Sequence, residues 1–446
     1  MKTFRGGIHP PENKDSSLYN PIKYARIPKF VTIPLSQHIG APARSCVQVG
    51  DTVKVGTKIG ESTGFISSAV HSSISGTVKK IDIFPHPTLG KAEAVMIESD
   101  GLDERDPSIT NRPDVETLSP EQIIDIVKEA GIVGLGGAAF PANVKLSPPP
   151  SKKIDAVIIN GAECEPYLTC DHLSMLFSPI EVLKGAQLIQ KAVGAKKCYI
   201  GIESNKMDAI ELLFSKIRGH KFKDIEPVPV KVKYPQGAEK QLIKAILGRE
   251  VPLGGLPMDV GVVAQNVGTA IAIYEAVYHA KPLYERLVTV CGKSLKTSQN
   301  VKVRIGVSFR ELIQEVGGLI NQPLKVIMGG PMMGIAQENL DVPVIKATSG
   351  LLTLAPYELK KLRTRPCIRC GRCVSICPMG LVPNMLTLAG ESERYEWAEE
   401  LGVRDCIECG SCAYICPAKR PMTHSVKMTK HELFRRERRQ KELESK

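Results

Sequence analysis

The sequence of 446 residues is too long for one ordinary domain and, at about 100 to 200 residues per domain, predicts three or four. Its 43% hydrophobic and 24% charged residues are typical of a soluble protein, and no apolar run approaches the roughly 18 residues of a membrane span. The net charge of +12 suggests nucleic acid, but aromatic residues make up only 5% and do not interleave with the bases, so we expect no nucleic-acid partner.

The first 100 residues predict an extended arm followed by short strands. Residues 1–28 lack periodicity and the apolar core of a signal peptide, so we expect the protein to stay in the cytoplasm. In residues 29–100 apolar and polar side chains alternate between glycine turns, a pattern similar to the barrel-sandwich hybrid of biotinyl and lipoyl carriers. The hairpin at 65–72 lacks the lysine that carriers modify, so we interpret this part as a scaffold.

A glycine-rich loop at 131–141 follows a predicted helix from Ser119 to Ala130. Its glycines at 134, 136 and 137 let a phosphate or a flat ring approach the backbone N–H groups. The sequence of this loop is compatible with a dinucleotide-binding fingerprint, but that motif lies between a strand and the start of a helix. Here a helix precedes the loop and Pro141 follows it, so we predict another kind of ligand loop.

An apolar, β-branched run at 154–159 predicts a buried parallel strand. It delivers residues 160–166 to its carboxyl end, the usual ligand position in open α/β sheets. Glu163 and Glu165 suit the hydroxyl groups of a ribose, and two exposed loop carboxylates are the alternative. Cys164 lies between them without a nearby histidine in the sequence, so we do not expect a nucleophile.

Helices and strands alternate afterwards, and residues 118–284 predict a Rossmann-like α/β domain. We expect helices at 178–193 and 205–217 and strands at 197–203 and 228–234. The loop at 234–240 puts Gly237 at a helix N-terminus, which favours a phosphate, and a further helix opens at 264–270. Short strands around a helix near 309–316 predict a β-grasp, SLBB-like domain at 285–354.

Two cysteine runs with one spacing mark the C-terminal part. Both fit C-x2-C-x2-C-x3-C-P, which predicts a helical ferredoxin module at 358–425 with two [4Fe-4S] clusters; zinc is the alternative. Because the fourth cysteine of each run binds the other cluster in such modules, the predicted ligand sets are crossed. They are Cys367, Cys370, Cys373 and Cys416 for one cluster, and Cys406, Cys409, Cys412 and Cys377 for the other.

The basic tail at 426–446 predicts a solvated helix, with docking to a partner or to anionic lipid as the alternative. The predicted fold class is therefore multidomain α/β. It comprises a barrel-sandwich hybrid, a Rossmann-like flavoprotein domain, a β-grasp domain and a helical two-cluster module.

Three loops at 134–145, 160–166 and 234–242, with 265–269 after them, resemble the NADH-oxidising flavoprotein subunit of respiratory complex I. From the segment Gly6-Gly-Ile-His-Pro-Pro-Glu-Asn-Lys14 to the paired cysteine runs, the whole chain resembles the C subunit of the Rnf (Rsx-type) electron-transport complex. This resemblance implies FMN, NAD(H) and two iron–sulfur clusters as cofactors.

The resemblance also implies site residues. Those that hold FMN are Gly134, Gly136, Lys145, Asn160, Glu163 and Asn266, joined by Gly237 at its helix N-terminus. Those that contact NADH are Gly137, Phe140, Glu165 and Glu239. Leu135 replaces an arginine of the complex I loop and Ala162 replaces an aspartate, so we expect FMN to be held differently. No residue is expected to act as a catalytic acid or base.

The implied function is a peripheral subunit of an ion-translocating ferredoxin:NAD oxidoreductase on the cytoplasmic face of the membrane. Its implied partners are the other subunits, NADH and, through the complex, ferredoxin. A flavin is needed between NADH and the iron–sulfur clusters, because a hydride carries two electrons and a cubane accepts one. The alternatives are a soluble cobalamin reductase with the same modules and a wiring or docking subunit that keeps the clusters without flavin.

Overall fold

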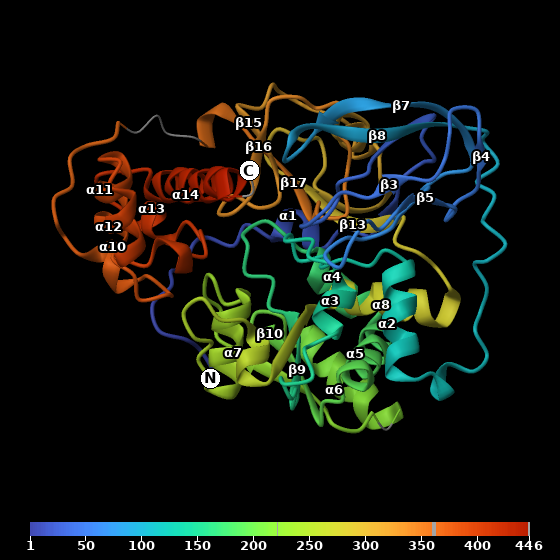
Figure 1. Cartoon of the computed structure of the whole chain (residues 1–446), viewed down its shortest axis with the longest axis horizontal. Helices are drawn as coiled ribbons and strands as arrows, with labels where there is room; N and C mark the ends of the chain where they lie inside the picture. The colour runs from blue at the N-terminus through green and yellow to red at the C-terminus, as the bar shows by residue number, and fades with distance from the viewer. Residues whose placement is uncertain (221, 359–362, 445–446) are drawn as a thin grey trace.

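The computed structural model describes residues 1–220, 222–358 and 363–444. Figure 1 shows an α/β domain at the bottom, a β-rich part above it and a helical module at the left. Residues 359–362 of the predicted linker and ferredoxin module, and 445–446 of the predicted tail, lie outside the described residues. The multidomain α/β class is confirmed by the sheets and helices of these parts.

Two antiparallel sheets form the N-terminal barrel-sandwich part. One has the order β2-β8-β7-β4 and contains β2 (Phe30–Pro34), β4 (Thr52–Val53), β7 (Gly76–His86) and β8 (Gly90–Ser99). The other joins β3 (Arg44–Ser45), β5 (Lys58–Glu61) and β6 (Val70–His71). Alternate residues such as Val95 and Ile97 are buried, because successive side chains of a strand point to opposite faces.

A parallel four-stranded sheet with the order β11-β10-β9-β12 carries the α/β domain. Its strands are β9 (Ala156–Gly161), β10 (Lys197–Glu203), β11 (Ile225–Val230) and β12 (Val262–Asn266). The helices α5 (Pro179–Val193) and α8 (Val267–His279) pack on one face, and α7 (Glu239–Leu247) packs on the other. Helix α6 (Met207–His220) lies beside α5 and contacts β11, while α2 (Pro120–Glu129) and α4 (Cys170–Phe177) pack against α5 and α8.

Two predicted boundaries in this domain are wrong. Residues 262–266 form β12, whereas the sequence pattern predicts a glycine-rich segment followed by a helix from 264. Five residues between a 3-10 turn and α8 are too few for a strand pattern to emerge, and pairing with β9 decides their conformation. The strand β11 ends at Val230, earlier than predicted, because its pairing with β10 ends there.

The β-grasp part is a six-stranded sheet with the order β1-β14-β13-β17-β15-β16. Its strands are β1 (Lys23–Tyr24), β13 (Glu285–Cys291), β14 (Gln299–Arg304), β15 (Lys325–Met328), β16 (Ile335–Gln337) and β17 (Gly350–Leu354). A capping box of Ser308 and Glu311 starts its helix α9 (Phe309–Glu315). The edge strand β1 comes from the N-terminal arm, which also contains the short helix α1 (Asp15–Leu18). The arm therefore contributes a strand to the β-grasp sheet.

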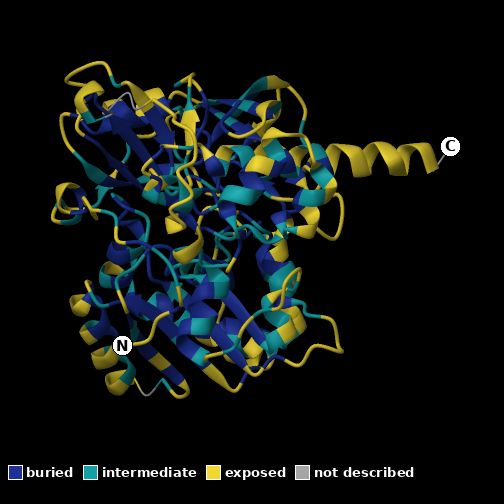
Figure 2. Ribbon diagram, turned by 90° about the vertical axis from the view of Figure 1, so that its left-hand side faces the viewer, coloured by how far each residue is buried: buried dark blue, intermediate teal, exposed yellow. Residues whose placement is uncertain are grey.

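The C-terminal module is helical: α10 (Arg372–Ser375), α11 (Pro383–Glu391), α12 (Tyr395–Glu400), α13 (Ser411–Ile415) and α14 (Met422–Glu444). Leu386, Val426 and Leu433 belong to its own small core. The end of α14 projects from the body with exposed side chains (Figure 2). No helix among the described residues has the length and hydropathy needed to cross a bilayer.

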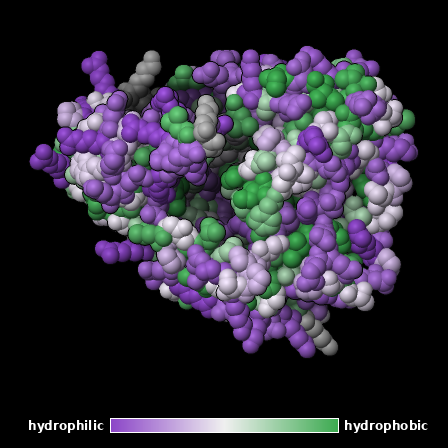
Figure 3. All heavy atoms as spheres, in the orientation of Figure 1, coloured by the Kyte–Doolittle hydropathy of each residue, from purple (hydrophilic) through white to green (hydrophobic). Residues whose placement is uncertain are grey.

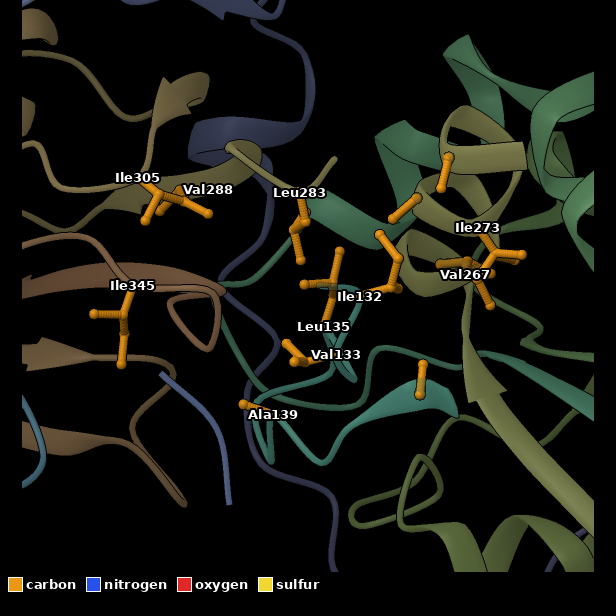
Figure 4. Packing of buried hydrophobic residues seen from close by; sticks show 14 of the residues in the cluster. Ile132, Val133, Leu135, Ala139, Val267, Ile273, Leu283, Val288, Ile305 and Ile345 are labelled. Carbon is orange, nitrogen blue, oxygen red and sulfur yellow. The ribbon is translucent and has the colours of Figure 1, made fainter. Parts of the chain in front are cut away.

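One hydrophobic core joins the other three parts. In Figure 4, Ile132, Val133 and Leu135 of the glycine-rich loop lie beside Leu283, with Val267 of α8 to one side and Val288 of the β-grasp sheet to the other. The loop is thus anchored by apolar side chains on both flanks. Its glycine backbone is therefore held in place by contacts within the protein.

Candidate cofactor sites

The glycine-rich loop meets the carboxyl ends of β9 and β12. Asn160 of β9 and Asn266 of β12 are register partners, and β10 and β11 lie on the far side of β9. The strand order therefore reverses between β9 and β12, which is the ligand position in doubly wound sheets. A Cβ atom on Gly136 would lie 3.5 Å from the Cβ of Asn266, and Leu135 N–H donates to Thr269 Oγ1 at 2.9 Å.

Most predicted FMN residues come together in this crevice. The Asn160 side chain donates to the Gly237 carbonyl at 2.7 Å, which joins the loop after β9 to the loop before α7. Lys145, in the short helix α3 (Ala142–Leu146), pairs with Glu239 of α7 and donates to the Ala264 carbonyl at 3.1 Å. The crevice thus offers one cation, two carboxamides and open backbone, which fit a phosphate and a polar ring.

The glycine-rich loop itself is closed by its own backbone. Gly134 N–H donates to the Phe140 carbonyl at 2.8 Å, and Ala139 N–H donates to the Gly134 carbonyl at 3.1 Å. Gly137 has a φ of +105° and nothing within 4 Å of where a Cβ atom would lie. The tip at Gly137 therefore leaves room for a ligand next to Phe140.

Glu163 is buried and engaged by the protein. Its carboxylate accepts Asp171 N–H at 2.7 Å and His172 N–H at 3.2 Å, at the start of α4, and lies 3.8 Å from Lys14 Nζ. Asp171 also accepts from the Asn266 side chain at 2.7 Å. Burial, together with the charge of Glu163, raises the pKa of Asp171 to about 7. Asp171 escapes sequence analysis because it lies five residues beyond the loop and in no motif.

Glu165 lies nearby but contacts a different domain. Its carboxylate accepts the N–H groups of Met332 at 3.2 Å and Met333 at 2.8 Å, in the loop between β15 and β16. Burial raises the pKa of Glu165 to about 7. The structure therefore separates the two glutamates: Glu163 supports the crevice from α4, and Glu165 fastens the β-grasp loop.

The eight cysteines of the tandem runs line two cavities in crossed sets. Cys377, Cys406, Cys409 and Cys412 line one cavity and are termed the near set, and Cys367, Cys370, Cys373 and Cys416 line the other and are termed the far set. None of the thirteen cysteines of the chain forms a disulfide. Among the described residues no three cysteine sulfurs lie within 4.8 Å of one another, whereas thiolates on one zinc ion at about 2.3 Å lie about 3.8 Å apart. The sulfurs are therefore not gathered as closely as a single zinc ion would hold them.

The near set faces the α/β domain. Tyr234 Oη donates to the Cys409 carbonyl at 2.7 Å, and Tyr234 and Cys409 share a buried cluster with Cys164 and Met332. In Figure 3 the surface is hollowed where the helical module meets the rest of the chain. The far set is more open, since Cys367 and Cys370 are exposed. Sequence spacing gives both sets but not which one faces the crevice.

Family models match four parts of the chain. They are the RnfC barrel sandwich hybrid domain at 2–102, the Nuo51 FMN-binding domain at 127–275, the SLBB domain at 287–336 and the 4Fe-4S dicluster domain at 359–417. The predicted resemblances and the predicted cofactors FMN and [4Fe-4S] are confirmed by these matches.

Curated relatives match along nearly the whole chain. The C subunit of the Na(+)-translocating ferredoxin:NAD(+) oxidoreductase complex of Acetobacterium woodii is 48% identical and covers 97% of each chain. The C subunit of the proton-translocating ferredoxin:NAD(+) oxidoreductase complex of Clostridium ljungdahlii is 48% identical over 90% of this chain and 87% of its own. A crystal structure of an NAD+-reducing [NiFe]-hydrogenase matches at 18% identity and a TM-score of 0.48, covering 72% of this chain and 61% of that one.

Proposed function

The chain belongs to the RnfC family, the C subunits of ion-translocating ferredoxin:NAD(+) oxidoreductase complexes, and we propose that it exchanges electrons between NAD(H) and its membrane-bound partners through FMN and two [4Fe-4S] clusters. One observation carries the proposal: the loop 234–237 touches both kinds of site. Tyr234 donates to Cys409 of the near set, and Gly237 accepts from Asn160 in the crevice.

The crevice residues are proposed to hold FMN. Lys145 supplies the cation for its phosphate, Asn160 and Asn266 supply carboxamides, and Gly134, Gly136 and Gly237 leave the backbone accessible. Glu163 is proposed to support the flavin indirectly by holding the loop after β9 against α4, since its carboxylate accepts a backbone N–H of that helix. When bound, the flavin exchanges electrons in pairs with NAD(H) and singly with the clusters.

NADH is proposed to bind beside Gly137, Phe140 and Glu239, where the loop tip is open. Glu239 is paired with Lys145, so ligand binding there has to rearrange that pair. Glu165 is proposed to act on NADH indirectly, through the loop at 329–334 that it fastens. Its carboxylate becomes available to a ribose only if the bonds to Met332 and Met333 open.

The near set is proposed to bind the cluster that communicates with the crevice, and the far set the cluster that communicates with a partner. Around Cys367 and Cys370 the chain carries Arg365, Arg369 and Arg372, all exposed, and the exposed apolar Ile368. No ion pair involves these arginines among the described residues. An acidic electron-carrier domain of the complex, on the cytoplasmic face of the membrane, fits this surface.

Anaerobic titration of the purified chain with NADH tests the proposal. We expect about eight irons and one FMN per chain, with bleaching of both chromophores. Eight irons with no flavin and no effect of NADH would instead support a wiring subunit. Reduction of cob(II)alamin by the isolated chain, without membrane subunits in the preparation, would support the soluble reductase.

A further inference from the structure

The segment 6–14 near the N-terminus has no role in the function described so far, although it is part of the resemblance. In Figure 1 the N-terminal chain passes between the helical module and the α/β domain before it reaches α1. Its two ends contact two different cofactor sites. The first end touches a ligand loop of the near set, and the second touches the loop after β9.

The glycine end is fitted to the near set. Gly7 N–H donates to the Ile376 carbonyl at 2.8 Å, next to the ligand Cys377. Gly6 has a φ of +80°, and a Cβ atom there would lie 2.8 Å from the Ile376 oxygen and 2.9 Å from the Cys377 oxygen. Only glycine fits this approach, because the contacts are to backbone and the conformation disfavours other residues.

The middle of the segment continues across the α/β domain. Ile8 exchanges two backbone hydrogen bonds with Tyr234, at 2.8 Å and 2.9 Å. Tyr234 is the residue whose hydroxyl reaches Cys409. Further along, the Glu12 carbonyl accepts Tyr167 N–H at 2.8 Å. The segment therefore follows the boundary between the two cofactor regions over its whole length.

The lysine end is buried beneath the loop after β9. Lys14 Nζ donates to the Glu163 carbonyl at 2.7 Å and to the Leu168 carbonyl at 2.5 Å. It also lies 3.8 Å from the Glu163 carboxylate, and its side chain is 8% exposed. Glu163 has a φ of +48°, an uncommon conformation that these contacts stabilise. Lys14 is thus a positioning residue for the crevice.

We propose that residues 6–14 form a strap that fixes the flavin crevice and the near cluster at a set separation. The strap rests on the proposed function, since it positions the two groups between which electrons pass. Each NADH supplies two electrons, one for each cluster, and releases a proton with NAD+. Loss of the glycine end of the strap is expected to slow transfer between the sites and leave the chemistry at each site intact, whereas loss of its lysine end is expected to loosen the flavin crevice.

Gly6→Ala tests the glycine end, with Gly101→Ala as the matched control. Gly101 has a φ of +77° but nothing within 4 Å of a Cβ atom, so both variants carry similar backbone strain and only one carries a clash. In anaerobic rapid mixing with NADH, both should retain FMN and bleach it at the wild-type rate. Gly6→Ala should reduce the clusters at least about tenfold more slowly, seen by electron paramagnetic resonance. Wild-type cluster reduction in Gly6→Ala would overturn the strap.

Lys14→Met tests the other end and decides the question if Gly6→Ala fails to fold. Lys2→Met is its control, because Lys2 lies on the same arm and donates at 2.7 Å to the Ile246 carbonyl of α7. We expect Lys14→Met to keep about eight irons but to bind FMN about tenfold more weakly, with partial rescue in Lys14→Arg. Unchanged FMN affinity would overturn the role of Lys14. A wild-type chain without flavin would instead overturn the proposed function.

Discussion

Lys346 provides a direct test of how the three parts outside the helical module are joined. Its side chain is fully buried and donates to the Ala69 carbonyl of the barrel-sandwich part at 2.6 Å and to the Gly131 carbonyl before the glycine-rich loop at 2.7 Å. Burial lowers the pKa of Lys346 to about 7. Burial also lowers the pKa of His38 to about 4 and of His71 to about 3, so both imidazoles stay neutral above pH 7.

The expected effect is a pH-dependent stability. Unfolded lysine has a pKa of about 10.4, so between pH 7 and 10 the unfolded chain keeps a proton that folded Lys346 has lost. The free energy of unfolding contributed by Lys346 therefore rises with pH, by about 1.4 kcal/mol per unit and roughly 4 kcal/mol over this range. Lys346→Met removes the titrating group and hence this slope.

The assay is urea unfolding of the anaerobic wild-type chain and of Lys346→Met at several pH values, followed by circular dichroism. The only tryptophan, Trp397, lies in the helical module. Its fluorescence therefore reports the unfolding of that module separately from the unfolding of the other parts. The wild-type stability relative to the variant should rise from pH 7 to 10. Lys91→Met, at an exposed site, should show a constant difference. A constant difference for Lys346→Met as well would refute the argument.

Three further outcomes are expected. Cys409→Ser and Cys367→Ser should each lose about four of eight irons, whereas Cys46→Ser, outside the runs, should lose none; loss of all eight in one variant would show that the sites are not independent. Glu165→Gln should gain stability relative to wild type by up to about 3 kcal/mol as pH rises from about 4.3 to 7, because burial raises the pKa of Glu165 to about 7; urea unfolding at both pH values checks the sign. Arg369→Ser with Arg372→Ser should weaken the salt dependence of electron transfer to the partner and leave NADH bleaching unchanged, and an unaltered salt dependence would argue against the basic surface.

Spacing along the chain was sufficient for the cysteine runs and the glycine-rich loop. Cluster ligands such as Cys367 and Cys370 are separated by two residues, so the ligand pattern is visible locally. The β-branched run before Asn160 likewise predicts β9, because strand preference acts over a few residues. The fold class follows from such local patterns taken in order.

Very short elements, and contacts between residues far apart in the chain, could not be predicted from the sequence in this way. β12 has five residues, and it is a strand because β9 lies beside it. Asp171 joins the crevice because α4 turns it toward Asn266. Glu165 resembles a ligand of NADH in sequence, yet the fold places two amides from the β-grasp loop on its carboxylate. Each of these depends on a neighbour far along the chain.

The sequence by itself therefore determined the cofactor types and the ligand sets to be tested. Only the tertiary structure decided which cysteine set faces the crevice and what connects them. The contact between Gly7 and Ile376 joins residues far apart in the sequence, and no local period or spacing encodes it. Such contacts form when packing brings two separately folded surfaces together, so their geometry is a property of the assembled chain.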